Sequence, residues 1–365
     1  MRKGFRDAMP TPMFDLVKTL TEIPGPTGQE ELVHEWCANH WSGFAEHVEV
    51  TRVGNVAARV GGSGPSFIVL AHGDELGLMV KSISENGLLH IWPAGADRRG
   101  RPPHWYTPIN QPVAVLSENG PLDGQLCYAS GHVIGGASDK DFFTWDDWFV
   151  DLGYASREKV ESLGIHPGTR LCVNSPTRRL GDTIVGKAMD NRAAIAIATS
   201  VGERADASKL RYELWIGSSI QEENGLLGAS SIPEIHPFDA AIVLDVGLCG
   251  EVPGTKAENH PSKLGAGPII VHQDSSTNYS HRMSMALVNA GNEAGVPTQQ
   301  AVFQNYGSDG AELIRRGIET VLLAFPTRYT HSPNEMVTEQ DLVHCVDLIL
   351  AFLEREPLPA RWQGR

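Results

Sequence analysis

The chain has 365 residues, of which 41% are hydrophobic and 20% are charged, a balance typical of a folded globular protein and not of a disordered one. The formal net charge of −14 argues against a nucleic-acid partner, because no basic cluster offsets the acidic residues, and it favours the binding of cations. The length exceeds that of one small core and indicates a large α/β domain with a second, smaller domain.

The cysteines and the N-terminal residues indicate the compartment. Five cysteines are an odd number, and no Cys-x-x-Cys pair occurs among them, so neither a disulfide framework nor a zinc finger is expected. Met1 to Phe14 lacks the apolar core of a signal peptide, and no apolar run approaches membrane-spanning length. We therefore expect a cytoplasmic protein without a membrane partner.

The first part of the chain predicts helices followed by a buried strand. Apolar residues recur at helical spacing in Met13 to Leu20 and in Glu30 to Trp41. Val48 to Val60 resembles a strand pair around a turn, and Ser66 to Ala71 is a continuous apolar run typical of a buried strand. This run is followed directly by His72.

The composition changes from Leu78 to Pro176, where short β-like pieces alternate with Gly, Pro, Asn and Asp. This spacing predicts a small β domain of barrel type inserted into an α/β host, so that 1–77 and 177–365 form the host and 78–176 the insert. Within the insert, Arg98 to Pro112 is rich in proline and is expected to form a long surface loop.

The host resumes after the insert with alternating helices and strands. The predicted helices are Ala193 to Arg204, a helix opening at Gly225 to Ser231, Met283 to Ala294, Glu312 to Arg316, and a last helix that Thr338 caps and that runs to Leu353. The predicted strands are Tyr212 to Ile220, Ala240 to Leu244, Ala301 to Gln304 and Thr320 to Phe325. This order is typical of an α/β fold.

Two adjacent carboxylates, Glu222 and Glu223, stand where the apolar strand ending at Ile220 should stop. Side by side and poorly solvated, they would each tend to gain a proton unless a cation lies nearby, and a metal ion is the natural candidate. The alternative is an exposed pair that opens a helix, where acidic residues suit the helix dipole.

Further residues that can bind metals follow other strands. His72, Asp245 and His331 lie at or just past the ends of predicted strands, and Asp190 directly precedes a helix. In open α/β sheets the carboxyl ends of the strands form the ligand-binding edge. Taken singly, such a histidine is more often a satisfied polar group and such an aspartate an N-cap, but together these residues favour a metal site.

The number of these residues favours two metals. Two histidines and three carboxylates exceed the ligands of a single tetrahedral zinc that keeps an open position, and they suit two ions about 3.5 to 4 Å apart. Asp74, two residues after His72, could accept the ring N–H of that histidine and fix its orientation.

The motifs resemble, in order and approximate spacing, the M42 family of dinuclear metallo-aminopeptidases, of the glutamyl or leucyl and tetrahedral aminopeptidase type. The resemblance extends from about Leu16 to Leu353. The segments that carry it are His72-Gly73-Asp74-Glu75-Leu76-Gly77, Ala188-Met189-Asp190-Asn191-Arg192, Gln221-Glu222-Glu223-Asn224-Gly225-Leu226-Leu227-Gly228-Ala229, Leu244-Asp245-Val246 and Arg328-Tyr329-Thr330-His331-Ser332.

The resemblance implies roles for individual residues. Asp190 would bridge two divalent ions, with Zn²⁺ favoured over Co²⁺ or Mn²⁺. His72 and Asp245 would complete one site, and Glu223 and His331 the other. Glu222 would be the general base and Asp74 would orient His72. The peptide bond between Asp190 and Asn191 would be cis.

The resemblance also implies a fold, a substrate and an assembly. The host would be an α/β/α sandwich around a mixed sheet. The substrates would be short peptides with a free N-terminus, and the protein would form a homo-oligomer, a dimer or a dodecamer, through its inserted domain. Asn224 stands where the family usually has a small apolar residue, which would alter the entrance beside Glu222.

Alternatives remain open. The same ligands would serve an amidase or deacylase that acts on N-acyl amino acids, and a non-catalytic oligomer stabilised by metals would also bind them. A glycosidase that uses Glu222 and Glu223 is disfavoured, because adjacent residues seldom place their carboxyls on opposite sides of a sugar bond. The sequence does not indicate the preferred N-terminal residue.

Overall fold

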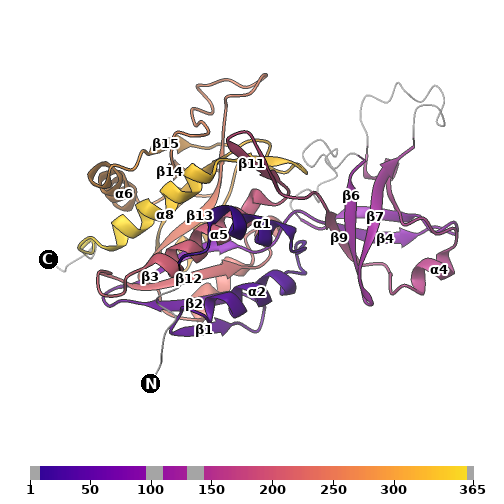
Figure 1. The fold of residues 1–365 in the computed structure, drawn as a ribbon, viewed down its shortest axis with the longest axis horizontal. Helices are drawn as coiled ribbons and strands as arrows, with labels where there is room; N and C mark the ends of the chain where they lie inside the picture. Colours follow the sequence, from indigo (N-terminus) through magenta and orange to yellow (C-terminus); the bar gives the residue numbers. More distant parts are fainter. Residues whose placement is uncertain (1–8, 96–109, 130–143, 360–365) are drawn as a thin grey trace.

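The apolar runs of the host pair into one mixed sheet of eight strands, in the computed structural model that describes residues 9–95, 110–129 and 144–359. In spatial order the strands are β1 (His47–Val50), β2 (Val56–Gly61), β12 (Glu213–Ser219), β3 (Ser66–His72), β13 (Ala240–Leu248), β16 (Glu319–Thr327), β14 (Ile269–Gln273) and β15 (Gln299–Val302). The strands β12, β3, β13 and β16 are parallel neighbours, so their carboxyl ends lie at one edge (Figure 1).

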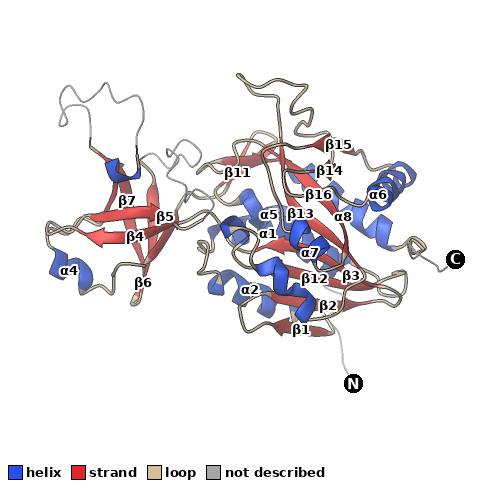
Figure 2. Ribbon diagram, turned by 180° about the vertical axis from the view of Figure 1, so that it is seen from behind, coloured by secondary structure: helices blue, strands red, loops and turns tan. Residues whose placement is uncertain are grey.

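The central strands are buried on both faces and separate two cores. In β3, Phe67 and Val69 pack into one core while Ile68 and Leu70 pack into the other, as the two-residue repeat of a strand requires. The first core is covered by α1 (Met13–Glu22), α2 (Glu31–Trp41), α5 (Met189–Arg204), α6 (His281–Ala294) and α8 (Glu339–Leu353). The opposite face, which is turned toward the viewer in Figure 2, carries α7 (Gly310–Arg315). The short 3₁₀ helix η5 (Gly228–Glu234) packs against the same core. The prediction of an α/β/α sandwich around a mixed sheet is therefore confirmed.

The insert contains a closed barrel with its own apolar core, and it lies to one side of the host in Figure 1. Around the barrel the strands are β4 (Leu78–Ile83), β5 (Leu89–Pro93), β8 (Trp148–Asp151), β7 (Gly120–Tyr128), β6 (Pro112–Ser117) and β9 (Arg170–Val173). The insert also holds the 3₁₀ helix η3 (Trp145–Asp147) and the helix α4 (Arg157–Glu161). The predicted β-barrel is confirmed. The loop expected from Arg98 to Pro112 lies mostly outside the described residues, which leave out 96–109.

A small second sheet of the host was not predicted. It consists of β10 (Arg178–Leu180), β11 (Thr183–Gly186) and β17 (Glu335–Val337), paired antiparallel. Its strands are three or four residues long, which is too short to produce a clear alternating pattern.

Two expected elements near the edge differ from the structure. The strand expected to end at Leu244 continues to Leu248, because β13 stays paired with β16 through Leu248 and Thr327. The helix expected to open at Gly225 is replaced by two 3₁₀ helices, η4 (Glu222–Asn224) and η5, because Gly225 and Leu226 have φ angles of 101° and 64° and interrupt a right-handed helix. In the described ranges, no helix is long and apolar enough to cross a bilayer.

Candidate metal centre

The site lies where the parallel strands end. The strand β3 ends at His72, and the next residue, Gly73, donates its N–H to the carbonyl of Ser219 at 2.8 Å, which keeps the ends of β3 and β12 together. Two residues after β12 ends, Gln221 adopts a left-handed φ of 49°, and the chain turns into η4. This turn places both Glu222 and Glu223 in the buried edge, where they are 7% and 5% exposed.

Asp190 lies between the two histidines. Its Oδ1 is 3.2 Å from Nε2 of His72, and its Oδ2 is 3.3 Å from Nε2 of His331. The peptide bond to Asn191 is cis, as the resemblance implied, and Asn191 donates from Nδ2 to the carbonyl of Leu244 at 2.8 Å. One carboxylate therefore offers a separate oxygen to each histidine.

The other predicted ligands surround this carboxylate. Potential ligand atoms of His72, Glu222 and Asp245 lie within 4.8 Å of one another, as do those of His72, Asp190 and Glu223. His331 is not part of either group, but it lies next to the second one, with its Nε2 3.5 Å from Oε1 of Glu223. Asp245 lies inside β13, not at its end, yet its side chain reaches the same edge.

Asp74 supports both the histidine and the two glutamates. Its Oδ1 lies 3.2 Å from Nδ1 of His72, and its carboxylate accepts the backbone N–H groups of Glu222 at 3.0 Å and of Glu223 at 3.2 Å. Burial alone raises the pKa of Asp74, but hydrogen bonding and the charge of His72 outweigh it and lower the pKa below its usual value. The side chain is fully buried, so the carboxylate holds these groups in place without competition from water.

The electrostatics of the site call for cations. Burial raises the pKa of Glu222 and Asp245 well above their ordinary values and that of Glu223 to about 7. Among the described residues, no lysine or arginine forms an ion pair with any of these three carboxylates or with Asp190. Since buried carboxylates require pairing or metal coordination, four of them with two imidazoles fit divalent cations as a donor set.

The neighbouring carboxylates raise the pKa of both histidines. Burial lowers the pKa of His331, but Glu223 and Asp190 outweigh it and raise the pKa to about 10. Burial also lowers the pKa of His72, but the negative charge of Glu222 and the hydrogen bonds to Asp190 and Asp74 outweigh it. They raise the pKa of His72 well above its ordinary value. Both rings therefore lie in a strongly negative environment that would equally attract a metal ion.

Three further buried acids lie around the site. Glu335 accepts backbone N–H groups from Asp190 and His331, Glu30 accepts that of Gln221 at 3.1 Å, and Asp309 accepts the hydroxyl of Ser219. Burial raises the pKa of Glu335 to about 8 and those of Glu30 and Asp309 to about 7. Glu335 and Glu30 were missed in the sequence, because Glu335 lies in a strand of three residues and Glu30 lies directly before a helix, where no spacing pattern marks them.

A family model matches most of the chain. Residues 54–348 match the model of the M42 glutamyl aminopeptidases. The lysyl aminopeptidase of Pyrococcus furiosus is 30% identical over 356 residues, which cover 93% of this chain and 96% of that protein.

Solved structures agree with these matches. The TET aminopeptidase of the marine sediment archaeon Thaumarchaeota archaeon SCGC AB-539-E09 superimposes with a TM-score of 0.87 at 27% identity, covering 94% of this chain and 96% of that one. The TET1 peptidase of Pyrococcus horikoshii, which can assemble into a tetrahedron or a large octahedral shell, has a TM-score of 0.83 at 26% identity, covering 93% of this chain and 99% of that one. The predicted family resemblance and the assignment to metal-dependent aminopeptidases are confirmed, and the amidase alternative is not favoured. The chain belongs to the M42 glutamyl aminopeptidase family of hydrolases.

Proposed function

We propose that Asp190 bridges two divalent cations, that His72 and Asp245 complete one site, and that Glu223 and His331 complete the other. The observation that supports this most is the position of the Asp190 carboxylate, with one oxygen 3.2 Å from His72 and the other 3.3 Å from His331. Zn²⁺ is the favoured ion, with Co²⁺ or Mn²⁺ as substitutes, because imidazole and carboxylate ligands suit all three.

Glu222 is the proposed general base. Two bound cations would supply the Lewis acidity that polarises the scissile carbonyl and makes an attacking water more acidic. Glu222 then takes the proton of that water and delivers it to the leaving amine, a role that suits a buried carboxylate whose pKa is raised. Asp74 holds Glu222 by its backbone and His72 by its ring throughout these steps.

The substrates we propose are short peptides with a free N-terminus. The matching family model is that of an aminopeptidase, which cleaves next to a free α-ammonium group, and the net charge of −14 favours cationic ligands. An acylated N-terminus lacks this charge, so N-acyl peptides would bind poorly.

We further propose a homo-oligomeric, cytoplasmic protein. The TET1 relative assembles into large shells, and a dimer or dodecamer built through the insert, 78–176, would be the corresponding state here. All five cysteines are free thiols, which fits a reducing compartment. Light scattering after size-exclusion chromatography gives the mass of the assembly, and a monomeric mass would contradict this proposal.

The function is tested with a panel of amino-acid p-nitroanilides. Activity should disappear with a chelator, return with Zn²⁺ or Co²⁺, and be absent on N-acetylated versions of the same substrates. Glu222→Gln should lower kcat by about 100-fold to 10,000-fold while both ions remain bound. Glu203→Gln is the matched control, because Glu203 is a partly buried acid that contacts Thr11 and His40. Activity that survives the chelator or the Glu222→Gln substitution would rule the mechanism out.

A further inference from the structure

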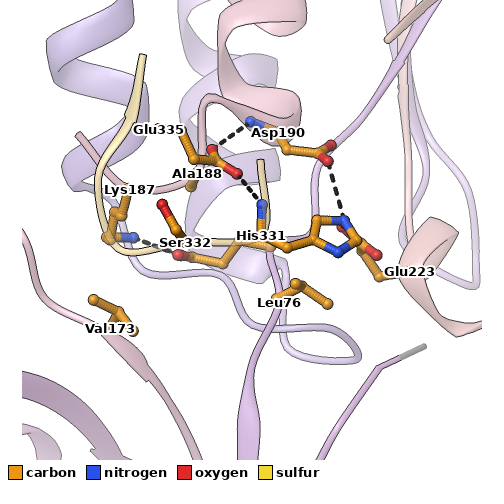
Figure 3. Close-up of a pocket in the computed structure, with 10 residues that line it drawn as sticks. Leu76, Val173, Lys187, Ala188, Asp190, Glu223, His331, Ser332 and Glu335 are labelled. Atoms are coloured by element: carbon orange, nitrogen blue, oxygen red, sulfur yellow. Dashed lines mark hydrogen bonds and ion pairs between the residues drawn. The ribbon is translucent and has the colours of Figure 1, made fainter. Parts of the chain in front are cut away.

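One carboxylate joins two of the proposed ligands through their backbones. Glu335 is 2% exposed and begins β17, where it pairs with Gly186 of β11. Its Oε2 accepts the N–H of Asp190 at 3.0 Å, and its Oε1 accepts the N–H of His331 at 2.7 Å (Figure 3). Asp190 begins a helix and His331 lies in a loop after β16, so Glu335 connects segments far apart in the chain.

The segments that Glu335 connects have unfavourable backbone conformations. Ala188, two residues before Asp190, has a φ of 52°, and Tyr329 and His331 have φ angles of 62° and 64°. Residues other than glycine rarely adopt this left-handed region, and surrounding contacts must hold them there. The two hydrogen bonds to Glu335 are such contacts.

A third contact links Glu335 to the ligand oxygen itself. The hydroxyl of Thr330 lies 3.0 Å from Oδ2 of Asp190 and 3.3 Å from Oε1 of Glu335. Both oxygens of Glu335 therefore act as acceptors. A glutamine has only one acceptor oxygen, so its NH₂ group would face one of the backbone N–H groups.

We infer that Glu335 is a positioning residue that sets the separation of Asp190 and His331 before an ion binds, and so controls the affinity of the ion that they share with Glu223. This inference rests on the proposed two-cation site. Asp190 would also hold the other ion, but the remaining ligands of that ion, His72 and Asp245, make no described contact with Glu335, so that ion should depend on Glu335 less.

The test is a calorimetric titration of the metal-depleted full-length protein with Zn²⁺. Wild type should bind two ions, and Glu335→Gln should bind one of them 10-fold to 100-fold more weakly, the usual effect of removing a partner behind a metal ligand. The affinity for the other ion should change by less than about threefold. Combined with His331→Ala, which removes the ligand, Glu335→Gln should have little further effect on the remaining ion.

Asp341→Asn is the matched control. Asp341 is also fully buried, and it also uses both oxygens, accepting the N–H groups of Gly265 at 2.7 Å and Gly267 at 2.8 Å and the hydroxyl of Thr338. It lies at the start of α8, and its described contacts include none of the proposed ligands. Asp341→Asn should lower the thermal unfolding temperature and leave both metal affinities unchanged, which separates positioning from general stability.

The outcomes are distinguishable. If wild type binds fewer than two ions, the proposed site itself is wrong. In the other case, wild type binds two ions while Glu335→Gln either leaves both Zn²⁺ affinities unchanged or lowers both by the same factor. Either result overturns only the inference about Glu335. If Glu335→Gln does not fold, hydrogen exchange of the Asp190 and His331 amides in wild type decides, since slow exchange with chelator present supports the inference and fast exchange overturns it.

Discussion

The carboxylate of Asp74 accepts the backbone N–H of Glu222 at 3.0 Å. The same oxygen lies 3.2 Å from Nδ1 of His72, and the other accepts the N–H of Glu223 at 3.2 Å. A single buried group thus fixes a proposed ligand and the proposed base relative to each other.

Asp74→Asn should therefore impair catalysis without removing a ligand. Asparagine has one acceptor oxygen, so at least one of these three donors would face an NH₂ group. We expect kcat/KM to fall by about 10-fold to 100-fold, with weaker binding of the ion at His72. Steady-state kinetics at saturating metal and a Zn²⁺ titration measure the two effects, with Asp347→Asn at a partly exposed ion pair as the control. Unchanged values of both would contradict the role given to Asp74.

The buried ion pair of Lys187 and Glu75 should contribute strongly to stability. Nζ of Lys187 lies 2.7 and 2.6 Å from the two oxygens of Glu75, and both side chains are 4% exposed. Lys187→Met leaves the carboxylate with Arg192 at 3.6 Å as its nearest cation and should cost about 3 kcal/mol or more in the free energy of unfolding.

Urea titrations measure this loss. The double variant Glu75→Gln/Lys187→Met should recover part of the loss, because it no longer buries an unpaired charge. Lys209→Met, at an exposed position, serves as the control. A cost for Lys187→Met no larger than that of the control would refute the prediction.

His34 should make folding sensitive to acid. Burial lowers the pKa of its ring to about 4 from 6.5, while Nδ1 contacts the carbonyl of Gly54 and Nε2 the hydroxyl of Ser218. The unfolded chain therefore binds a proton at a higher pH than the folded protein does. This contribution to stability is complete above pH 6.5, and about 3 kcal/mol of it is lost as the pH falls toward 4.

Unfolding free energies measured in chelator between pH 7 and pH 4 test this loss, since the chelator removes the pH dependence of metal binding. The difference between wild type and His34→Gln should shrink by about 3 kcal/mol as the pH falls. His281→Gln, at an exposed position, should keep the wild-type slope. A pH-independent difference for His34→Gln would show that the ring is not held neutral.

The local hydrophobic pattern predicted which residues lie at the carboxyl edge of the sheet, but it did not predict where every strand near this edge ends. The apolar run before His72 and the run before Glu222 became the parallel neighbours β3 and β12, and this adjacency brings the two residues together. Asp245 was expected to follow its strand, yet it lies within β13, because pairing with β16 extends the strand beyond the apolar run. Pairing between distant segments decides such ends, and it leaves no periodic signal.

The sequence by itself determined the class of the fold and the barrel insert, because buried strands follow from local hydrophobic pattern, and it offered the seven residues that meet at the edge as polar residues close to the ends of predicted elements. Only the tertiary structure decided what holds those residues. Glu335 and Asp74 each reach backbone N–H groups of segments remote in the chain, and Glu30 and Asp309 lie buried behind them. A backbone N–H carries no side-chain identity, so the contacts that position the proposed ligands cannot be recognised from residue types.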